Sequence, residues 1–138
     1  MDKKQLARIH RVRTLQLGLA QAAEAKANEG LASETALANR IAELARAVAP
    51  APSAAPGVSL AAAAHYRERL HHSAHAAENR VHAATRQAEA ASLARQEAHR
   101  DQTAVEKLIA RVDAADVLKA MRALEDAPHY KKVRHDPC

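Results

Sequence analysis

The chain contains almost no aromatic side chains: its 138 residues include no phenylalanine or tryptophan and only two tyrosines, Tyr66 and Tyr130. Hydrophobic residues nevertheless make up 48% of the sequence, because alanine supplies most of that share. Alanine favours helix but removes little apolar surface from water when it is buried. A compact globule would lack large side chains to fill its centre, so the composition indicates an elongated, all-α protein of one domain.

Cysteine and glycine are also scarce, and their scarcity argues against several function classes. Cys138 is the only cysteine, so no internal disulfide can form. Gly18, Gly30 and Gly57 are the only glycines, and none has the strand–turn–helix context of a phosphate-binding loop. Acidic residues alternate with basic ones, as on a solvated helix surface. We therefore expect no enzyme activity, no cofactor and no small-molecule substrate.

No segment predicts secretion or membrane insertion. The first residues, Met1-Asp2-Lys3-Lys4, lack the apolar core of a secretory signal. The stretch from Ala47 to Ala64 is uncharged, but it contains three prolines and a glycine, and its alanines are only weakly apolar. The sequence thus predicts a cytoplasmic protein.

Three of the five prolines, together with Gly57, fall within residues 49–57 and divide a helical pattern into two parts. Apolar and small residues recur at alternating spacings of three and four on both sides, which predicts an antiparallel two-helix coiled-coil hairpin. We expect a helix over 3–48, a connection over 49–58, a second helix over 59–127 with Ser59 as N-cap, and a basic tail over 128–138. The predicted seam of the first helix is Leu6, Ile9, Arg13, Gln16, Ala20, Ala23, Ala27, Gly30, Glu34, Leu37, Ile41, Leu44 and Val48. That of the second is Leu60, Ala63, Arg67, Leu70, Ala74, Ala77, Val81, Ala84, Ala88, Ala91, Arg95 and Ala98.

The two predicted helices differ in length, so the second should overhang the first. If Val48 lies opposite Ser59, equal rise along both helices places Leu6 opposite Asp101. The remaining overhang of about 25 residues would be roughly 35 to 40 Å long. It would expose the densest group of large aliphatic side chains to water, which implies a partner, a fold-back of this segment or a second copy of the chain. That group is Val105, Leu108, Ile109, Val112, Val117, Leu118, Met121 and Leu124.

A cluster of histidines invites comparison with a metal site. His71, His75, Glu78 and His82 fall on one narrow stripe of the second helix, and imidazoles four residues apart can bind zinc or nickel. The stripe flanks the predicted seam, where a metal would be open to water without supporting ligands. We therefore predict a solvated face and no required metal.

Basic residues dominate both ends of the sequence. The formal net charge is +5, and Lys3, Lys4, Arg8, Arg11 and Arg13 are accompanied only by Asp2 in the first thirteen residues, while Lys131, Lys132 and Arg134 lie near the other terminus. An antiparallel hairpin brings these ends together, so this end should bind an acidic surface or nucleic acid. Nucleic acid is the less favoured partner, because the sequence shows no recognition-helix module and has only two tyrosines for base stacking.

The run Ala98-His99-Arg100-Asp101-Gln102-Thr103-Ala104-Val105-Glu106-Lys107-Leu108-Ile109-Ala110-Arg111 resembles the FliJ family of bacterial flagellar export proteins. Members commonly carry an Arg and a Glu-Lys-Leu run followed by Arg late in their second helix. The resemblance implies an antiparallel coiled coil similar to the stalk of rotary ATPases. It also implies a non-enzymatic export component located in the cytoplasm, peripheral to the export apparatus of the inner membrane.

The resemblance further implies three partners: the hexameric ring of the export ATPase, the export-gate membrane protein and export chaperones. We expect apolar contacts and charge pairing with carboxylates of the ring to act through the end that bears the termini. The expected contact residues are Leu6, Arg8, Ile9, Arg11, Val12, Arg13, Val105, Lys107, Leu108, Arg111 and Val112. The rival interpretations are a structural coiled coil that self-associates through the overhang and a basic protein associated with nucleic acid.

Overall fold

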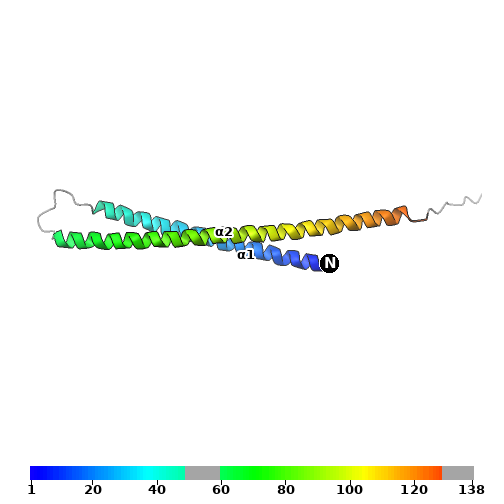
Figure 1. The fold of residues 1–138 in the computed structure, drawn as a ribbon, viewed down its shortest axis with the longest axis horizontal. Helices are drawn as coiled ribbons and strands as arrows, with labels where there is room; N and C mark the ends of the chain where they lie inside the picture. Colours follow the sequence, from blue (N-terminus) through cyan, green and yellow to red (C-terminus); the bar gives the residue numbers. More distant parts are fainter. Residues whose placement is uncertain (49–59, 129–138) are drawn as a thin grey trace, which may run out of the picture.

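The computed structural model describes residues 1–48 and 60–128. It shows two helices, α1 (Lys3–Ala47) and α2 (Leu60–Glu125), packed against each other as an antiparallel hairpin (Figure 1). The predicted all-α two-helix fold is confirmed. The expected connection over 49–58, the N-cap Ser59 and the basic tail beyond Pro128 lie outside the described residues.

The first turn of α1 is held by its N-cap, Asp2, whose backbone is extended (φ −73°, ψ 139°). The backbone N–H of Gln5 donates to the carbonyl of Asp2 at 2.9 Å, and the N–H of Asp2 donates to Oε1 of Gln5 at 3.4 Å. These bonds satisfy backbone groups that a helix end otherwise leaves without partners. The helix therefore begins in a defined place, with Lys3 and Leu6 already in its first two turns.

The seam of α2 follows the predicted alternation. From Ala63 to Ala98, the side chain at every predicted position is buried or half-buried. The remaining predicted position is Leu60, whose side chain the structure does not describe. The same spacing continues through Gln102, Val105, Ile109 and Val112. A strict repeat of seven residues produces a left-handed supercoil, and Figure 1 shows α1 crossing behind α2 along the rod.

Half of the predicted α1 seam is wrong. Leu6, Arg13, Ala20, Ala27, Glu34, Ile41 and Val48 lie on the buried side as predicted, but Ile9, Gln16, Ala23, Gly30, Leu37 and Leu44 are exposed. Their places are taken by the residues one position later: His10, Leu17, Glu24, Leu31, Ala38 and Ala45. The observed seam partly buries Leu17 and Leu31. It also places the carboxylate of Glu24 beside Arg95 in the seam of α2.

Ion pairs between the helices fix the register. Glu24 Oε2 lies 2.6 Å from Arg95 Nε, and these side chains keep only 20% and 35% of their exposure. Glu34 pairs with Arg80 at 3.1 Å. Arg13 pairs with Asp101 at 2.8 Å, so the expectation that Leu6 lies opposite Asp101 is wrong.

The register differs because α2 begins beyond the end of α1, as Figure 1 shows. The sequence-based register assumed that Val48 lies opposite Ser59. In the structure α1 lies further along α2 than this register predicts, so Leu6 is close to Ile109 and Val112 at the other end of the rod.

The packed interior is thin. Among the described residues, only Leu6, Ala77, Ala88 and Val105 are buried. Two of these are alanines, so little apolar area is removed from water along most of the hairpin. The large buried side chains, Leu6 and Val105, both lie at the end where α1 starts.

Candidate partner-binding end

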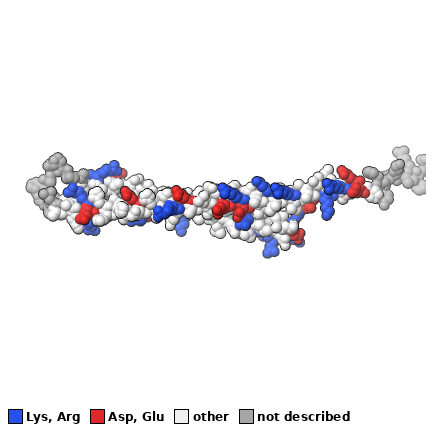
Figure 2. Space-filling model, viewed as in Figure 1, with Lys and Arg blue, Asp and Glu red and all other residues white. Residues whose placement is uncertain are grey.

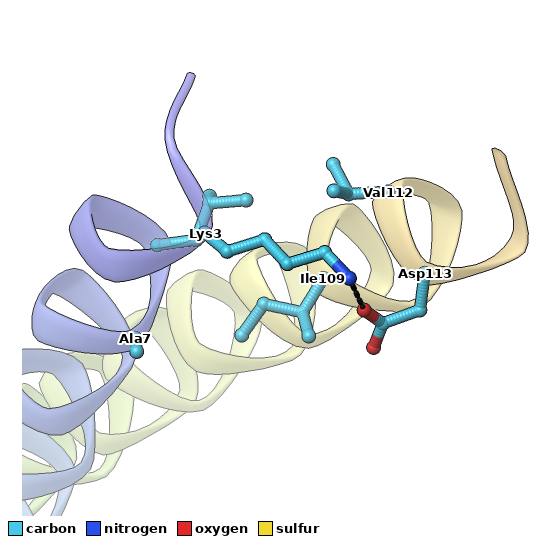
Figure 3. A pocket seen from close by; sticks show the side chains of 6 residues that line it. Lys3, Ala7, Ile109, Val112 and Asp113 are labelled. Atoms are coloured by element: carbon cyan, nitrogen blue, oxygen red, sulfur yellow. Dashed lines mark ion pairs between the residues drawn. The ribbon is translucent and has the colours of Figure 1, made fainter. Parts of the chain in front are cut away.

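The end of the rod that carries the start of α1 is closed by a small apolar contact and an ion-pair bridge. Leu6 and Ala7 of α1 and Ile109 and Val112 of α2 line one small hollow between the helices. Lys3 reaches across them, and its Nζ lies 2.9 Å from Asp113 Oδ1 (Figure 3). The same Nζ lies 2.6 Å from Asp116 Oδ2. Hydrogen bonds to Asp116 and Asp113 raise the pKa of Lys3 from 10.5 to about 12.

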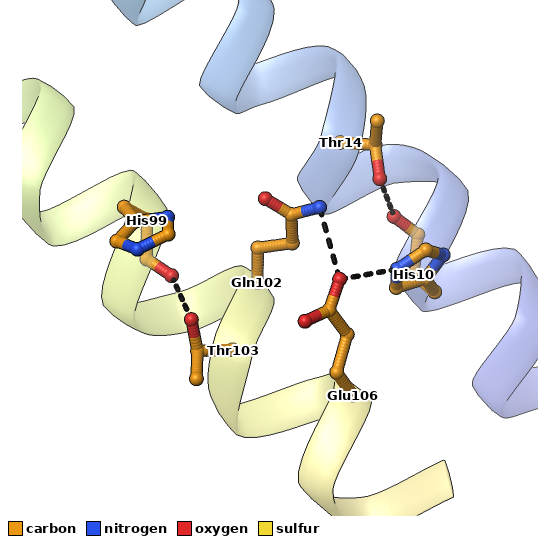
Figure 4. Close-up of polar contacts among 6 residues, drawn as sticks. All are labelled: His10, Thr14, His99, Gln102, Thr103 and Glu106. Atoms are coloured by element: carbon orange, nitrogen blue, oxygen red, sulfur yellow. Dashed lines mark hydrogen bonds and ion pairs between the residues drawn. The ribbon is translucent and has the colours of Figure 1, made fainter.

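A polar cluster lies further along the same end (Figure 4). His10 Nε2 is 3.2 Å from Glu106 Oε1, and the side-chain amide of Gln102 donates to the same oxygen at 3.1 Å. The hydroxyls of Thr14 and Thr103 donate to backbone carbonyls one turn earlier, those of His10 and His99, at 2.9 Å. Among these contacts, only the one between His10 and Glu106 joins the two helices, whereas the bonds of Gln102, Thr14 and Thr103 each stay within one helix.

Some of the predicted contact residues hold the hairpin together. Leu6 and Val105 are buried, Val112 is half-buried beside Leu6, and Arg13 is paired with Asp101. Substituting any of these side chains would change the hairpin itself before it changed a partner surface.

The other predicted contact residues face solvent. Ile9, Val12 and Leu108 keep 37%, 52% and 43% of their exposure. The exposed cations form no ion pair within the described parts of the chain; they are Arg8, Arg11, Lys107 and Arg111. These seven residues remain available to a partner.

The overhang of α2 is shorter than expected. It begins after Asp116, the last residue that Lys3 reaches, and runs to the helix end at Glu125, a rise of about 14 Å. Val105, Ile109 and Val112 are therefore part of the hairpin, not of the overhang. Within the overhang, Val117, Leu118, Met121 and Leu124 are 53% to 75% exposed.

The apolar stripe of the overhang does not continue the seam. The stripe consists of Val117, Met121 and Leu124, with Ala114 on the same line just before the overhang begins. At about 100° per residue, it lies roughly 130° around the helix from Val105, Ile109 and Val112. The stripe thus points away from the side that α1 occupies. A partner can reach it without displacing α1.

Two exposed leucines of α1 had no role in the sequence interpretation. Leu15 and Leu19 keep 64% and 73% of their exposure. They lie on the side of α1 opposite the observed seam. The predicted seam of α1 was wrong at half of its positions, so it did not identify this side. The sequence feature that could have identified it is the absence of acidic residues from Lys3 to Ala23.

The histidine stripe lies on the solvated side of α2. His75 Nδ1 is 4.0 Å from Glu78 Oε2, and His72 Nε2 is 4.0 Å from Glu68 Oε1, with all four side chains at least 69% exposed. In residues 1–48 and 60–128, no three His, Cys, Asp or Glu side chains are arranged to hold a metal ion.

Neither described helix contains a segment long and apolar enough to cross a membrane. Comparison of the chain with protein-family models, curated proteins and solved structures found no match. The candidate site is therefore defined by its geometry: a closed hairpin end, exposed cations on both helices and an apolar overhang.

Proposed function

We propose that this protein is a non-enzymatic component of flagellar or type III protein export. In this proposal it inserts the end bearing the start of α1 into the hexameric ring of the export ATPase and promotes ring assembly and coupling to the export gate. The observation that carries the proposal is the overhang: a single helix with an apolar stripe projects from a two-helix rod beside unpaired cations. The resemblance of residues 98–111 to the flagellar export coiled-coil family supports it.

The overhang supplies apolar contact and the adjoining end supplies charge. Val117, Met121 and Leu124 extend the rod along its axis, so they would enter a ring lumen first. Arg8, Arg11 and Arg111 would follow, where carboxylates of the ring can pair with them. The export gate and the export chaperones are proposed further partners.

The test is association of the full chain with its organism's export ATPase. Val117→Asp with Met121→Asp should abolish co-purification, because both side chains are exposed and lie outside the hairpin contact. Leu37→Asp with Leu93→Asp is the matched control, since these exposed leucines lie far from this end. Normal ATPase binding by the overhang variant would contradict the proposal.

A second candidate is self-association through the overhang. The stripe Ala114, Val117, Met121, Leu124 has a 3-4-3 spacing that reads the same in both directions, so two antiparallel overhangs can interdigitate. In that pairing Val117 meets Met121 of the second copy and Arg111 lies near its Glu125. Arg111→Glu should then weaken dimerisation, and Arg111→Glu with Glu125→Arg should restore it; sedimentation showing monomers at all concentrations would exclude this candidate.

A further inference from the structure

The beginning of α1 is a basic segment whose charges are only partly neutralised by α2. Residues 3–23 contain five lysines and arginines and no aspartate or glutamate. The carboxylates of α2 engage those that point inward: Asp113 and Asp116 pair with Lys3, and Asp101 pairs with Arg13. The remaining three cations form no ion pair within the described parts of the chain; they are Lys4, Arg8 and Arg11.

These cations share one face with exposed aliphatic side chains. At about 100° per residue, all six members of the set lie within roughly 50° of the direction opposite the seam of Leu6, His10, Arg13 and Leu17. We call this set the outward face; it consists of Lys4, Arg8, Arg11, Val12, Leu15 and Leu19. Its aliphatic members keep 52%, 64% and 73% of their exposure.

We propose that the outward face of α1 binds the surface of an anionic phospholipid bilayer. Helices that lie in the membrane interface combine an apolar face, which enters the acyl boundary, with lysines and arginines that pair with anionic headgroups. Arg8 lies between Leu15 and Leu19 in rotation, and its long stem lets the guanidinium reach the headgroups while the leucines insert. Neither described helix can cross the bilayer, so the contact is peripheral.

The shape of the face favours a bilayer over a protein or nucleic acid. It is the convex side of one helix, pointing directly away from α2, and the hollow lined by Arg8, Ile9, Val12, Arg13 and Gln16 lies at its edge. A bilayer requires no matching groove and accepts a ridge. A phosphate backbone would use the cations but would leave Leu15 and Leu19 in water.

The extent of the acid-free segment matches the geometry. Because the helices supercoil, α1 passes behind α2 and only its first part can face a flat surface on that side (Figure 1). The next acidic residues along α1 are Glu24, which is turned toward α2 and pairs with Arg95, and Glu29, which is exposed. Along the face of the rod seen in Figure 2, lysine and arginine side chains are otherwise interleaved with acidic ones.

The test is cosedimentation of the full chain with vesicles of phosphatidylcholine and phosphatidylglycerol in equal parts, compared with phosphatidylcholine alone. The wild type should sediment with the anionic vesicles and remain free with the neutral ones. Arg8→Gln with Arg11→Gln should weaken binding about 25-fold, since each cation near an anionic surface contributes roughly fivefold. Leu15→Gln with Leu19→Gln should abolish sedimentation with the anionic vesicles, and circular dichroism should show that this variant remains helical.

The matched control removes two charges at the other end of the same helix. Arg40→Gln with Arg46→Gln should change vesicle binding by less than about twofold, because these residues lie many Debye lengths of screened solution from the outward face. Equal binding to both vesicle types, no binding to either, or undiminished binding by the double leucine variant would overturn the proposal. Binding to duplex DNA that the leucine variant retains, without vesicle binding, would make the face a phosphate-backbone site and would also overturn it.

Discussion

Leu6 and Leu15 lie on the same helix in opposite environments, and they allow packing to be separated from surface function. Leu6 is 3% exposed against α2, whereas Leu15 is 64% exposed. Leu6→Ala should lower the free energy of unfolding by about 2 to 3 kcal/mol, because it removes buried methyl groups and leaves a cavity. Leu15→Ala should change it by less than about 0.5 kcal/mol. Urea unfolding measures both; equal effects of the two substitutions would contradict the observed seam.

Lys3 provides a residue-scale prediction about pH. Its pKa is raised from 10.5 to about 12 by hydrogen bonds to Asp116 and Asp113. Because the folded-state pKa is the higher one, the stabilising contribution of this bridge is fully present below pH 10.5 and is lost as the pH rises through about 12. Asp113→Asn with Asp116→Asn should return the pKa of Lys3 toward 10.5, as measured by NMR titration of its side chain. An unchanged titration would show that Lys3 does not bridge to α2.

At the scale of elements, the sequence predicted the seam of α2 correctly at every position from Ala63 to Ala98 and that of α1 only by half. In α2 one alternation alone collects Leu70, Val81 and a run of alanines, so the pattern was unambiguous. In α1 two alternations compete, since Ile9, Leu37 and Leu44 support one and Leu17 and Leu31 support the other. The choice depends on α2, because only the observed seam places Glu24 beside Arg95. Propensity and spacing within one helix contain no information about that contact.

The register was missed for a related reason. The sequence contains no marker of how far α2 begins beyond α1, and the alanine-rich seams fit at several offsets equally well. The ion pairs between the helices select one offset, in which Val105, Ile109 and Val112 belong to the hairpin and not to the expected overhang. Of the candidate site, the exposed cations and the existence of the overhang were visible in the sequence. Its length and the outward leucines were not.

The pair of Glu24 and Arg95 gives the element-scale prediction. Glu24→Arg would place two partly buried cations together and should lower the free energy of unfolding by about 2 kcal/mol. Exchanging both residues, Glu24→Arg with Arg95→Glu, should recover most of that loss, because the pair is reformed with its charges interchanged. Glu43→Arg is the control: Glu43 is exposed, and its change should cost less than about 0.5 kcal/mol. Failure of the exchange to recover stability would argue against this register.

At the scale of the whole molecule, the thin interior determines what the rod can do. Few large side chains are buried, and most of the exposed aliphatic side chains lie at one end of the hairpin or on the outward face. The stripe of the overhang and the outward face lie on different helices and point in different directions. The overhang stripe and the outward leucines are therefore separate surfaces, whereas Arg8 and Arg11 can pair with a ring or with a bilayer but not with both at the same time.

The length of the rod in solution distinguishes a single chain from a dimer that is joined through the overhangs. The 66 residues of α2 span about 99 Å at helical rise, so small-angle scattering of a single chain should give a maximum dimension of at least about that length and a cross-section of two helices. Antiparallel pairing of two overhangs would nearly double the length while leaving the cross-section unchanged, because the copies overlap only around residues 113–125. Light scattering of the same samples gives the mass and separates the two cases. A compact particle would contradict the rod itself. A dimer with the length of one chain and a four-helix cross-section would also contradict both arrangements, because the copies would then contact each other through the outward face or along the hairpin.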